Sequence, residues 1–197
     1  NKLFLPNSVA IYAGPAYSYD PESNTAAGSV KTPERDRWQR DRVTSWVREV
    51  SARIHRDHPE MWTSAAVWPY YADRWGWGVS EGYYDYYQDA KLWAADGSVD
   101  RIAPMMYLAR MDDLVDWRTV LADFAGDSGP SRIYPGVGGF YVDFAEIAAR
   151  IESARQAGAP GHVVFSYSGI DQQGHWDDFA GGPYRFPAQP PERTPEP

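Results

Sequence analysis

Acidic side chains recur in the segments that follow predicted strands, which is where enzymes built on parallel strands carry their reactive groups. The acids in such positions are Asp73, Glu81, Asp85, Asp89, Asp112, Asp113 and Asp171. Hydrolysis of a glycosidic bond uses two carboxyl groups, one to protonate the leaving oxygen and one to act as nucleophile or base. The alternative is a structural role, and Asp112 or Asp113 is better explained as a helix cap. Asp100 precedes a strand, so we expect it on the opposite, stabilising side.

Aromatic residues are unusually frequent, at 15% of the 197 residues, with nine Trp and fourteen Tyr. Several fall at or just after predicted strand ends: Trp68, Tyr70, Trp75, Trp77, Tyr107, Phe140, Tyr141 and Tyr167. Rings on a common face would line a groove for sugar rings, with polar groups at its rim. Any single ring could instead pack in the core or in a loop. The recurrence at four successive strand ends favours the groove.

Metal and nucleophile chemistry have little support in the sequence. His55 and His58 are three residues apart at the exposed end of a predicted helix, while His162 and His175 have no ligand partners nearby in sequence. There is no cysteine, no Gly-x-Ser-x-Gly motif, and no pattern that would activate Ser166. We therefore expect neither a metal nor a cofactor.

The composition disfavours two classes of partner. The formal net charge is −8 and the pI is near 4.9, a balance that disfavours binding to nucleic-acid phosphates. No run of about 18 apolar residues is present, so the sequence predicts no membrane span. The chain does not begin with Met and shows no signal peptide, so we expect Asn1 to be an internal start.

The elements that must position these residues are organised around residues 96–107. Gly97 follows a helical run and suits a left-handed helix cap. The apolar run from Val99 to Leu108 is typical of a strand in a parallel sheet, since both faces of such a strand are covered. Pro104 cannot donate a ladder hydrogen bond, so the strand is expected to bend there and direct Met106 and Tyr107 into a cleft.

Strands and helices alternate along the chain. Strands are predicted near 61–68, 99–107, 132–137 and 162–167, each preceded by a helix, with a possible further strand near Val9. The predicted helices begin after Thr32-Pro33, near Gly82, after Asp112 or Asp113, and at Asp143, where Glu146 completes a capping box. The first of them has an apolar side formed by Val43, Trp46, Val47, Val50 and Ile54. Residues 16–31 are predicted to form a loop.

This alternation indicates an α/β fold with parallel crossovers. A closed eight-stranded barrel takes about 250 residues, so the chain fits a partial (β/α)₈ barrel of roughly four to five strand–helix units. Residues 1–182 would form this domain, and the Pro-rich residues 183–197 a disordered tail or linker. The alternative is an open doubly wound sheet, but Gly136-Val137-Gly138-Gly139 lacks the full dinucleotide-binding spacing.

Several short motifs together resemble the carboxyl-terminal half of the glycosyl hydrolase-like 10 family, formerly domain of unknown function 187. The resemblance extends over about residues 17–170 and rests on the order and spacing of these motifs. The matching pieces are Ser18 to Ser23, Trp38 to Ile54, Ser64 to Pro69, Tyr87-Gln88-Asp89 with Trp93, Asp96 to Asp100, Pro104 to Tyr107, Tyr134 to Gly138, and Gly158 to Tyr167.

The resemblance implies a (β/α)₈ barrel, a bacterial extracytoplasmic location and a carbohydrate substrate, with peptidoglycan glycan strands among the candidates. It favours Asp89 as the catalytic acid, with a helix-terminus role as the alternative. The substrate-binding candidates are Trp68, Tyr70, Gln88, Tyr107, Tyr141 and Tyr167. One departure is important: where the family carries an acid and an arginine before the Tyr-Asp-Pro-Glu-Ser piece, this chain has Ser8 and Ile11.

Two classes of function follow. The chain is part of a glycoside hydrolase-like enzyme that shares its acids with a preceding half-barrel, or it is a non-catalytic glycan-binding remnant that keeps the aromatic groove. In either case a half-barrel has open sheet edges and an uncovered apolar inner face. We therefore expect self-association through the open barrel edge.

Overall fold

The computed structural model describes residues 20–107, 113–128, 132–141 and 143–188. Within them the chain is α/β, with the parallel pairs β1 (Ser64–Val67) with β2 (Arg101–Pro104) and β3 (Gly136–Gly138) with β4 (Val163–Phe165). An isolated parallel bridge between Ile102 and Ile133 connects the two pairs. The four predicted strands are thus confirmed as parallel, though each is shorter than predicted. The possible strand near Val9 lies outside the described residues.

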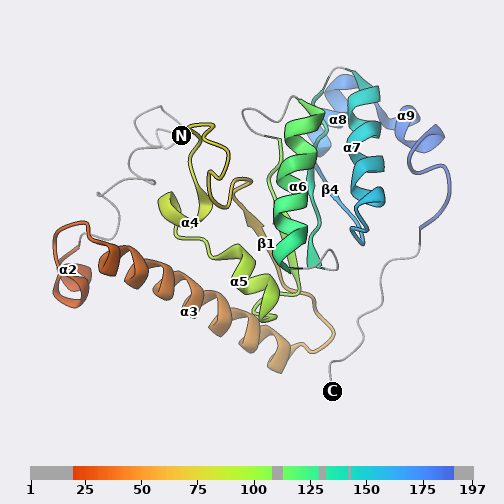
Figure 1. Ribbon diagram of the computed structural model, residues 1–197. Coiled ribbons are helices and arrows are strands. Elements are labelled where there is room, and N and C mark those ends of the chain that lie inside the picture. Colours follow the sequence, from red (N-terminus) through yellow and green to blue (C-terminus); the bar gives the residue numbers. More distant parts are fainter. Residues whose placement is uncertain (1–19, 108–112, 129–131, 142, 189–197) are drawn as a thin grey trace.

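Helices precede every strand, as predicted. They are α2 (Pro21–Ala27), α3 (Pro33–Asp57), α4 (Gly82–Asp85), α5 (Ala90–Ala95), α6 (Leu114–Ser128), α7 (Phe144–Gln156), α8 (Tyr167–Gln173) and α9 (Trp176–Gly181). The long α3 crosses beside α5, and α6 and α7 stand next to each other over the strands (Figure 1). No helix in the described ranges is long and apolar enough to cross a membrane.

The core lies between the strands and this helix layer. Alternate strand residues point toward the helices, and Val67, Ile102 and Val137 are almost fully buried there. From α6, Trp117 and Phe124 fill the same space. Val120 of α6 and Ile147 and Ile151 of α7 are also fully buried, because a spacing of three or four residues places such side chains on one helical face.

Local capping signals account for most helix starts. Thr32 caps α3 through a hydrogen bond from the Arg35 amide, with Pro33 in the first turn. At the start of α6 the Val115 amide donates to Asp113, and at the start of α7 the Ala145 amide donates to Asp143. After α5, Gly97 has a φ of 73°, the left-handed conformation expected there.

Two predicted segments differ from the structure. The loop predicted over residues 16–31 contains the short helix α2, capped by Asp20. The single helix predicted over Gly82–Ala95 is two short helices, α4 and α5. Between them Tyr87 has a φ of 56°, and the Gln88 side chain turns back to accept a hydrogen bond from the Trp68 amide. This contact with the end of β1 interrupts a helix that local propensity alone would continue.

The predicted apolar side of α3 is only partly correct, because Val43 packs against the core but two of the other residues do not. Val47 is buried, but Trp46 is 66% exposed and Val50 is 36% exposed. The buried side of the helix is mostly polar: Arg35, Gln39, Arg40, Thr44, Val47 and Ser51. Polar partners inside the fold explain the difference, since Thr44 accepts a hydrogen bond from the Trp93 indole at 2.9 Å.

The opposite face of the strands is only partly covered by described residues. Ala66 is exposed there, Val163 is 44% exposed and Phe165 is 50% exposed. Parallel sheets usually have both faces covered, so a face that the described residues leave partly open is uncommon.

The beginning of the predicted tail contacts the body of the protein. Tyr184 stacks on Phe179 with ring centroids 5.2 Å apart, and the Pro183 carbonyl accepts a hydrogen bond from Arg155. The Pro-rich residues from 189 onward lie outside the described residues.

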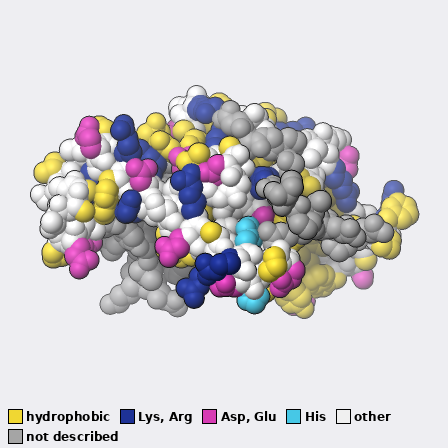
Figure 2. Space-filling view, turned by 90° about the horizontal axis from the view of Figure 1, so that it is seen from below, with side chains coloured by type: hydrophobic (Ala, Val, Ile, Leu, Met, Phe, Trp, Pro, Cys, Tyr) yellow, Lys and Arg dark blue, Asp and Glu magenta, His cyan; other side chains and the backbone are white. Residues whose placement is uncertain are grey.

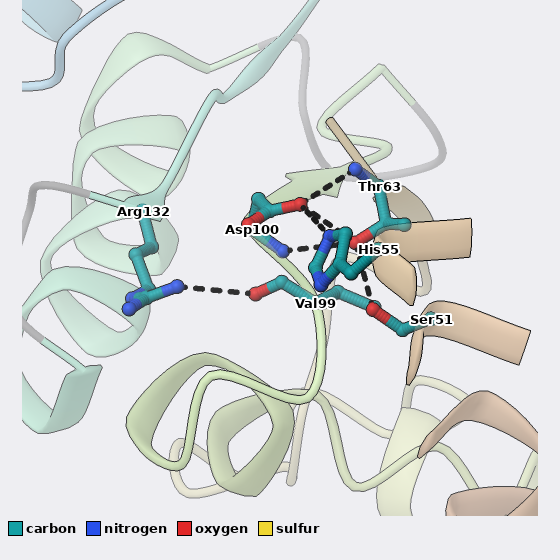
Figure 3. Close-up of polar contacts among 6 residues, drawn as sticks. All are labelled: Ser51, His55, Thr63, Val99, Asp100 and Arg132. Carbon is teal, nitrogen blue, oxygen red and sulfur yellow. Dashed lines mark hydrogen bonds and ion pairs between the residues drawn. The ribbon is translucent and has the colours of Figure 1, made fainter. Parts of the chain in front are cut away.

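A polar network holds the starts of β1 and β2 against the last turns of α3 (Figure 3). One oxygen of Asp100 accepts hydrogen bonds from the Thr63 amide at 2.7 Å and the Thr63 hydroxyl at 2.9 Å, and it lies 2.8 Å from Nε2 of His55. Ser51 bonds to the Thr63 hydroxyl at 3.0 Å. Burial raises the pKa of Asp100, but the hydrogen bonds from Thr63 and His55 outweigh this effect and hold the pKa below its ordinary value.

Replacing Asp100 by Ala should lower the free energy of unfolding by about 2–4 kcal/mol, because the buried donors of Thr63 lose their acceptor. The wild-type contribution should be present above about pH 4 and disappear as the pH falls through the lower folded-state pKa. Urea unfolding of both proteins at several pH values measures this. Asp57→Ala, at the exposed end of α3, is the control and should cost less than about 0.5 kcal/mol. Equal losses in the two variants would contradict the assigned role of Asp100.

Candidate functional site

The carboxyl ends of the strands lie at one edge because the strands are parallel, and the candidate site is built there. The segment after β1 provides Trp68, which is held from two sides. Its amide donates to Gln88 Oε1 at 2.7 Å, and its indole nitrogen donates to the Ser80 carbonyl at 2.6 Å. The Trp68 ring packs on Tyr86 with centroids 4.3 Å apart. The structure therefore brings the predicted residues Trp68 and Gln88 together.

Asp89 occupies the residue before α5, but its side chain does not cap the helix. Instead Oδ1 accepts a hydrogen bond from the Tyr71 hydroxyl at 2.8 Å. Burial and the hydrogen bond to Asp89 raise the pKa of Tyr71 far above its ordinary value, so the phenol remains a donor at all physiological pH values. Asp89 is thus directed toward the end of β1 rather than toward the helix amides.

A charge cluster made of a buried lysine and aspartate with a more exposed arginine lies next to this pair. Lys91 Nζ is 2.9 Å from Asp123 Oδ1 and 5.0 Å from the centre of the Tyr71 ring. Arg74, in the loop after β1, reaches the same Asp123 oxygen at 3.1 Å. The cluster ties the aromatic loop to α5 and α6, which fixes the ring that holds Asp89.

The other acids of this loop bind the backbone of the loop itself. Asp73 accepts from the amides of Trp77 at 2.9 Å and Gly78 at 2.6 Å, and these hydrogen bonds hold the pKa of Asp73 below its ordinary value. Glu81 accepts from the Asp73 amide, and Asp85 from the Glu81 amide. These contacts give the three acids a structural role.

The remaining acidic candidates have separate positions. Asp113 caps α6, as predicted, and Asp171 accepts a hydrogen bond from the indole of Trp176 at 3.1 Å. Asp112 lies outside the described residues. The hydroxyl of Thr63 and the ring of His55 both bind Asp100 rather than each other, so this cluster is no nucleophile–base–acid relay (Figure 3).

A second aromatic group lies after β2, β3 and β4. Tyr107 stacks on Phe165 with ring centroids 4.9 Å apart and an interplanar angle of 7°, and it meets Phe140 edge-on at 6.3 Å. Phe140 is 40% exposed and burial raises the pKa of Tyr107. Gly136 makes room for this group, because a Cβ there would lie 2.9 Å from the Tyr107 ring and 2.7 Å from the Pro104 carbonyl.

The other predicted binding residues divide between core and surface. Tyr70 and Tyr141 are buried, and Tyr141 packs under the guanidinium of Arg150. Tyr167 is 72% exposed and contacts Trp176. Their contact with a ligand remains a prediction.

Sequence reasoning missed two residues of this edge, Phe165 and Tyr71. The period-two alternation of β4 was the available signal for Phe165, since it places that ring on the face opposite Val164. For Tyr71 no spacing rule links it to Asp89.

No metal site is present among the described residues, and no basic patch is visible on the face that Figure 2 shows. There is no group of three or more His, Cys, Asp or Glu side chains that could hold a metal ion. Seen from the amino ends of the strands, Lys and Arg side chains mix with Asp and Glu over the surface (Figure 2). No family model matches the sequence, and a search of curated proteins finds no match.

The Tyr71–Asp89 contact can be tested by tyrosine titration. With ¹³C-labelled tyrosine, the Tyr71 signal, assigned by Tyr71→Phe, should not titrate near pH 10, where an ordinary tyrosine ionises. In Asp89→Asn the pKa of Tyr71 should fall but stay above ordinary, because the charge is lost and the burial remains. Asp177→Asn, an exposed acid on α9, should change nothing. An ordinary titration of Tyr71 in the wild type would contradict the contact.

Proposed function

We propose that this chain is the carboxyl-terminal part of a glycosyl hydrolase-like (β/α)₈ barrel, and that it binds a carbohydrate chain on the aromatic rings at the carboxyl ends of its strands. The observation that carries the proposal is the partly exposed ring group of Tyr107, Phe140 and Phe165. Such rings offer apolar faces to sugars, and carboxylates and amides nearby can take the hydroxyls.

The strand order supports the barrel part of the proposal. β1, β2, β3 and β4 follow one another in chain order, joined by the Ile102–Ile133 bridge, and α5, α6 and α7 form one layer. A doubly wound sheet reverses its strand order at a switch point and carries helices on both faces. Sequential parallel strands with helices on one side are the repeating arrangement of a barrel. The sequence resemblance favours the same fold, an extracytoplasmic location and a glycan such as that of peptidoglycan.

Glycoside hydrolysis is the second candidate, and the position of Asp89 favours it. Asp89 precedes a helix without capping it and instead accepts a hydrogen bond from the half-buried Tyr71 after β1, which places it for a role other than helix stability. Accepting a hydrogen bond from Tyr71 suits a carboxylate that acts as base or nucleophile. The acid partner would come from the barrel half that the resemblance places before this chain.

Glycan binding can be tested by calorimetric titration with chitohexaose and cellohexaose. Phe165→Ala and Tyr107→Ala should each weaken binding about five- to thirty-fold, the equivalent of about 1–2 kcal/mol for one lost ring contact. Trp46→Ala removes a ring from α3 that is more exposed than either of these and serves as the control, with unchanged affinity. Circular dichroism should confirm that all three variants fold. Affinities in the Phe165 and Tyr107 variants equal to that of the control would refute the aromatic surface.

The catalytic candidate needs a complete barrel, in which this chain is joined to a preceding half. There Asp89→Asn should lower kcat at least about 100-fold and leave KM within a few-fold, as expected for a group that acts in the transition state. Asp85→Asn, from the same loop region, is the matched control and should leave kcat nearly unchanged. If kcat survives in Asp89→Asn, the carboxylate is structural and only the binding function remains.

A further inference from the structure

A hollow lies at the amino ends of the strands, whereas the aromatic group lies at their carboxyl ends. It has a volume of about 580 Å³ and opens on the partly covered face of the sheet. Its walls include Trp62, Ser64, Arg101, Tyr134, His162 and Val163. All six lie just before a strand or at its first residue, so parallel pairing gathers them at one edge. The volume falls in the range of small-molecule sites.

Arg101 is held in this cavity by aromatic rings rather than by an acid. Its guanidinium carbon lies 4.1 Å from the centre of the Trp62 ring and 4.9 Å from that of Tyr134. Its Nε is buried and has no hydrogen-bond partner among the described residues. Ring contacts of this kind stabilise the positive charge but leave the N–H donors in need of an acceptor. Because Nε is closed to solvent, a ligand in the cavity would accept hydrogen bonds from the terminal guanidinium nitrogens of Arg101, a partly exposed residue of the lining.

The charges around Arg101 favour an anion. The chain has 27 acidic residues and a net charge of −8, yet none of the described residues that line the cavity is Asp or Glu. The neighbouring Asp100 is engaged on the helix side by Thr63 and His55. Burial, with a smaller contribution from the charge of Arg155, lowers the pKa of His162 to about 4, so its ring is neutral at pH 7. The positive charge of Arg101 is therefore not compensated inside the cavity.

We propose that this cavity binds a small organic carboxylate with a flat apolar body. The carboxylate would accept hydrogen bonds from the guanidinium of Arg101, whose planar fork matches two carboxylate oxygens. The body would lie against the exposed rings and aliphatic groups of the walls, where Trp62 is 38% and Val163 44% exposed. The hydroxyl of Ser64, exposed at the start of β1, is a further donor within the same lining.

The polar network at the strand starts fixes this arrangement. Successive strand residues point to opposite faces, so the anchoring of Thr63 and Asp100 on the helix side orients Trp62 and Arg101 toward the cavity. The site is independent of the proposed glycan surface, which lies at the other ends of the strands. If glycan binding fails, the proposed carboxylate site is not affected. If carboxylate binding fails, the proposed glycan surface is not affected.

The experiment compares benzoate with benzamide, which has the same ring and no charge, by calorimetry and by ligand-observed NMR. The wild-type chain should bind benzoate at least about tenfold more tightly than benzamide, the difference expected for a charged hydrogen-bonded pair. Arg101→Gln should abolish that preference, and Arg101→Lys should restore only part of it because lysine lacks the planar fork. Arg53→Gln, a highly exposed arginine on α3, is the charge-matched control and should bind like the wild type.

The comparison on the wild type keeps the proposal falsifiable even if an Arg101 variant fails to fold, which circular dichroism would reveal. Equal affinity for benzoate and benzamide, no binding of either, or benzoate binding retained in a folded Arg101→Gln variant would each overturn it. Sedimentation velocity, with and without benzoate, shows whether the chain self-associates. If the face is occupied by another copy of the chain that benzoate does not displace, the cavity is an association surface and the proposal is refuted.

Discussion

Parallel pairing of four short strands is the constraint on which the rest of this structure depends. It places every strand start at one edge and every strand end at the other, and it requires a helical crossover between successive strands. The strands have only three or four residues each, so ladder hydrogen bonds alone could not hold them. The helix layer and the Asp100 network supply the remaining support, because they fix the strand starts from the helix side.

Local signals in the sequence were sufficient where the structure is decided locally. Thr32-Pro33 and Asp143 specify helix starts through their own backbone and side-chain chemistry, and the spacing of Trp117, Val120 and Phe124 specifies the buried side of α6. Tertiary contacts decided the rest. The break after α4 depends on Gln88 reaching Trp68, twenty residues away, and the polar buried side of α3 depends on partners such as Trp93.

The candidate site shows the same division. Position after a strand located Trp68 and Tyr107 at the edge where parallel strands end, and the sequence resemblance named Gln88, which contacts Trp68 there. Position along the chain could not separate the acids by role. Asp73, Glu81 and Asp85 accept hydrogen bonds from nearby backbone amides. Asp89 instead accepts one from the Tyr71 hydroxyl. The cavity around Arg101 was also beyond sequence reasoning, since Trp62, Arg101 and Tyr134 come from three separate units.

The stack of Tyr107 on Phe165 connects the ends of β2 and β4 across β3, and the middle strand permits it only because its first residue is Gly136. The size of the residue at position 136 in β3 thereby determines whether the neighbouring strands can place two stacked rings at this edge. In diverging homologues, position 136 should remain glycine wherever this stack is kept, because a Cβ there would also lie 2.7 Å from the backbone carbonyl of Pro104, which no change at position 107 relieves. Glycine at position 136 together with an aromatic residue at position 107 would then mark distant relatives even where the individual motifs have faded, and would distinguish them from proteins that merely share the strand order.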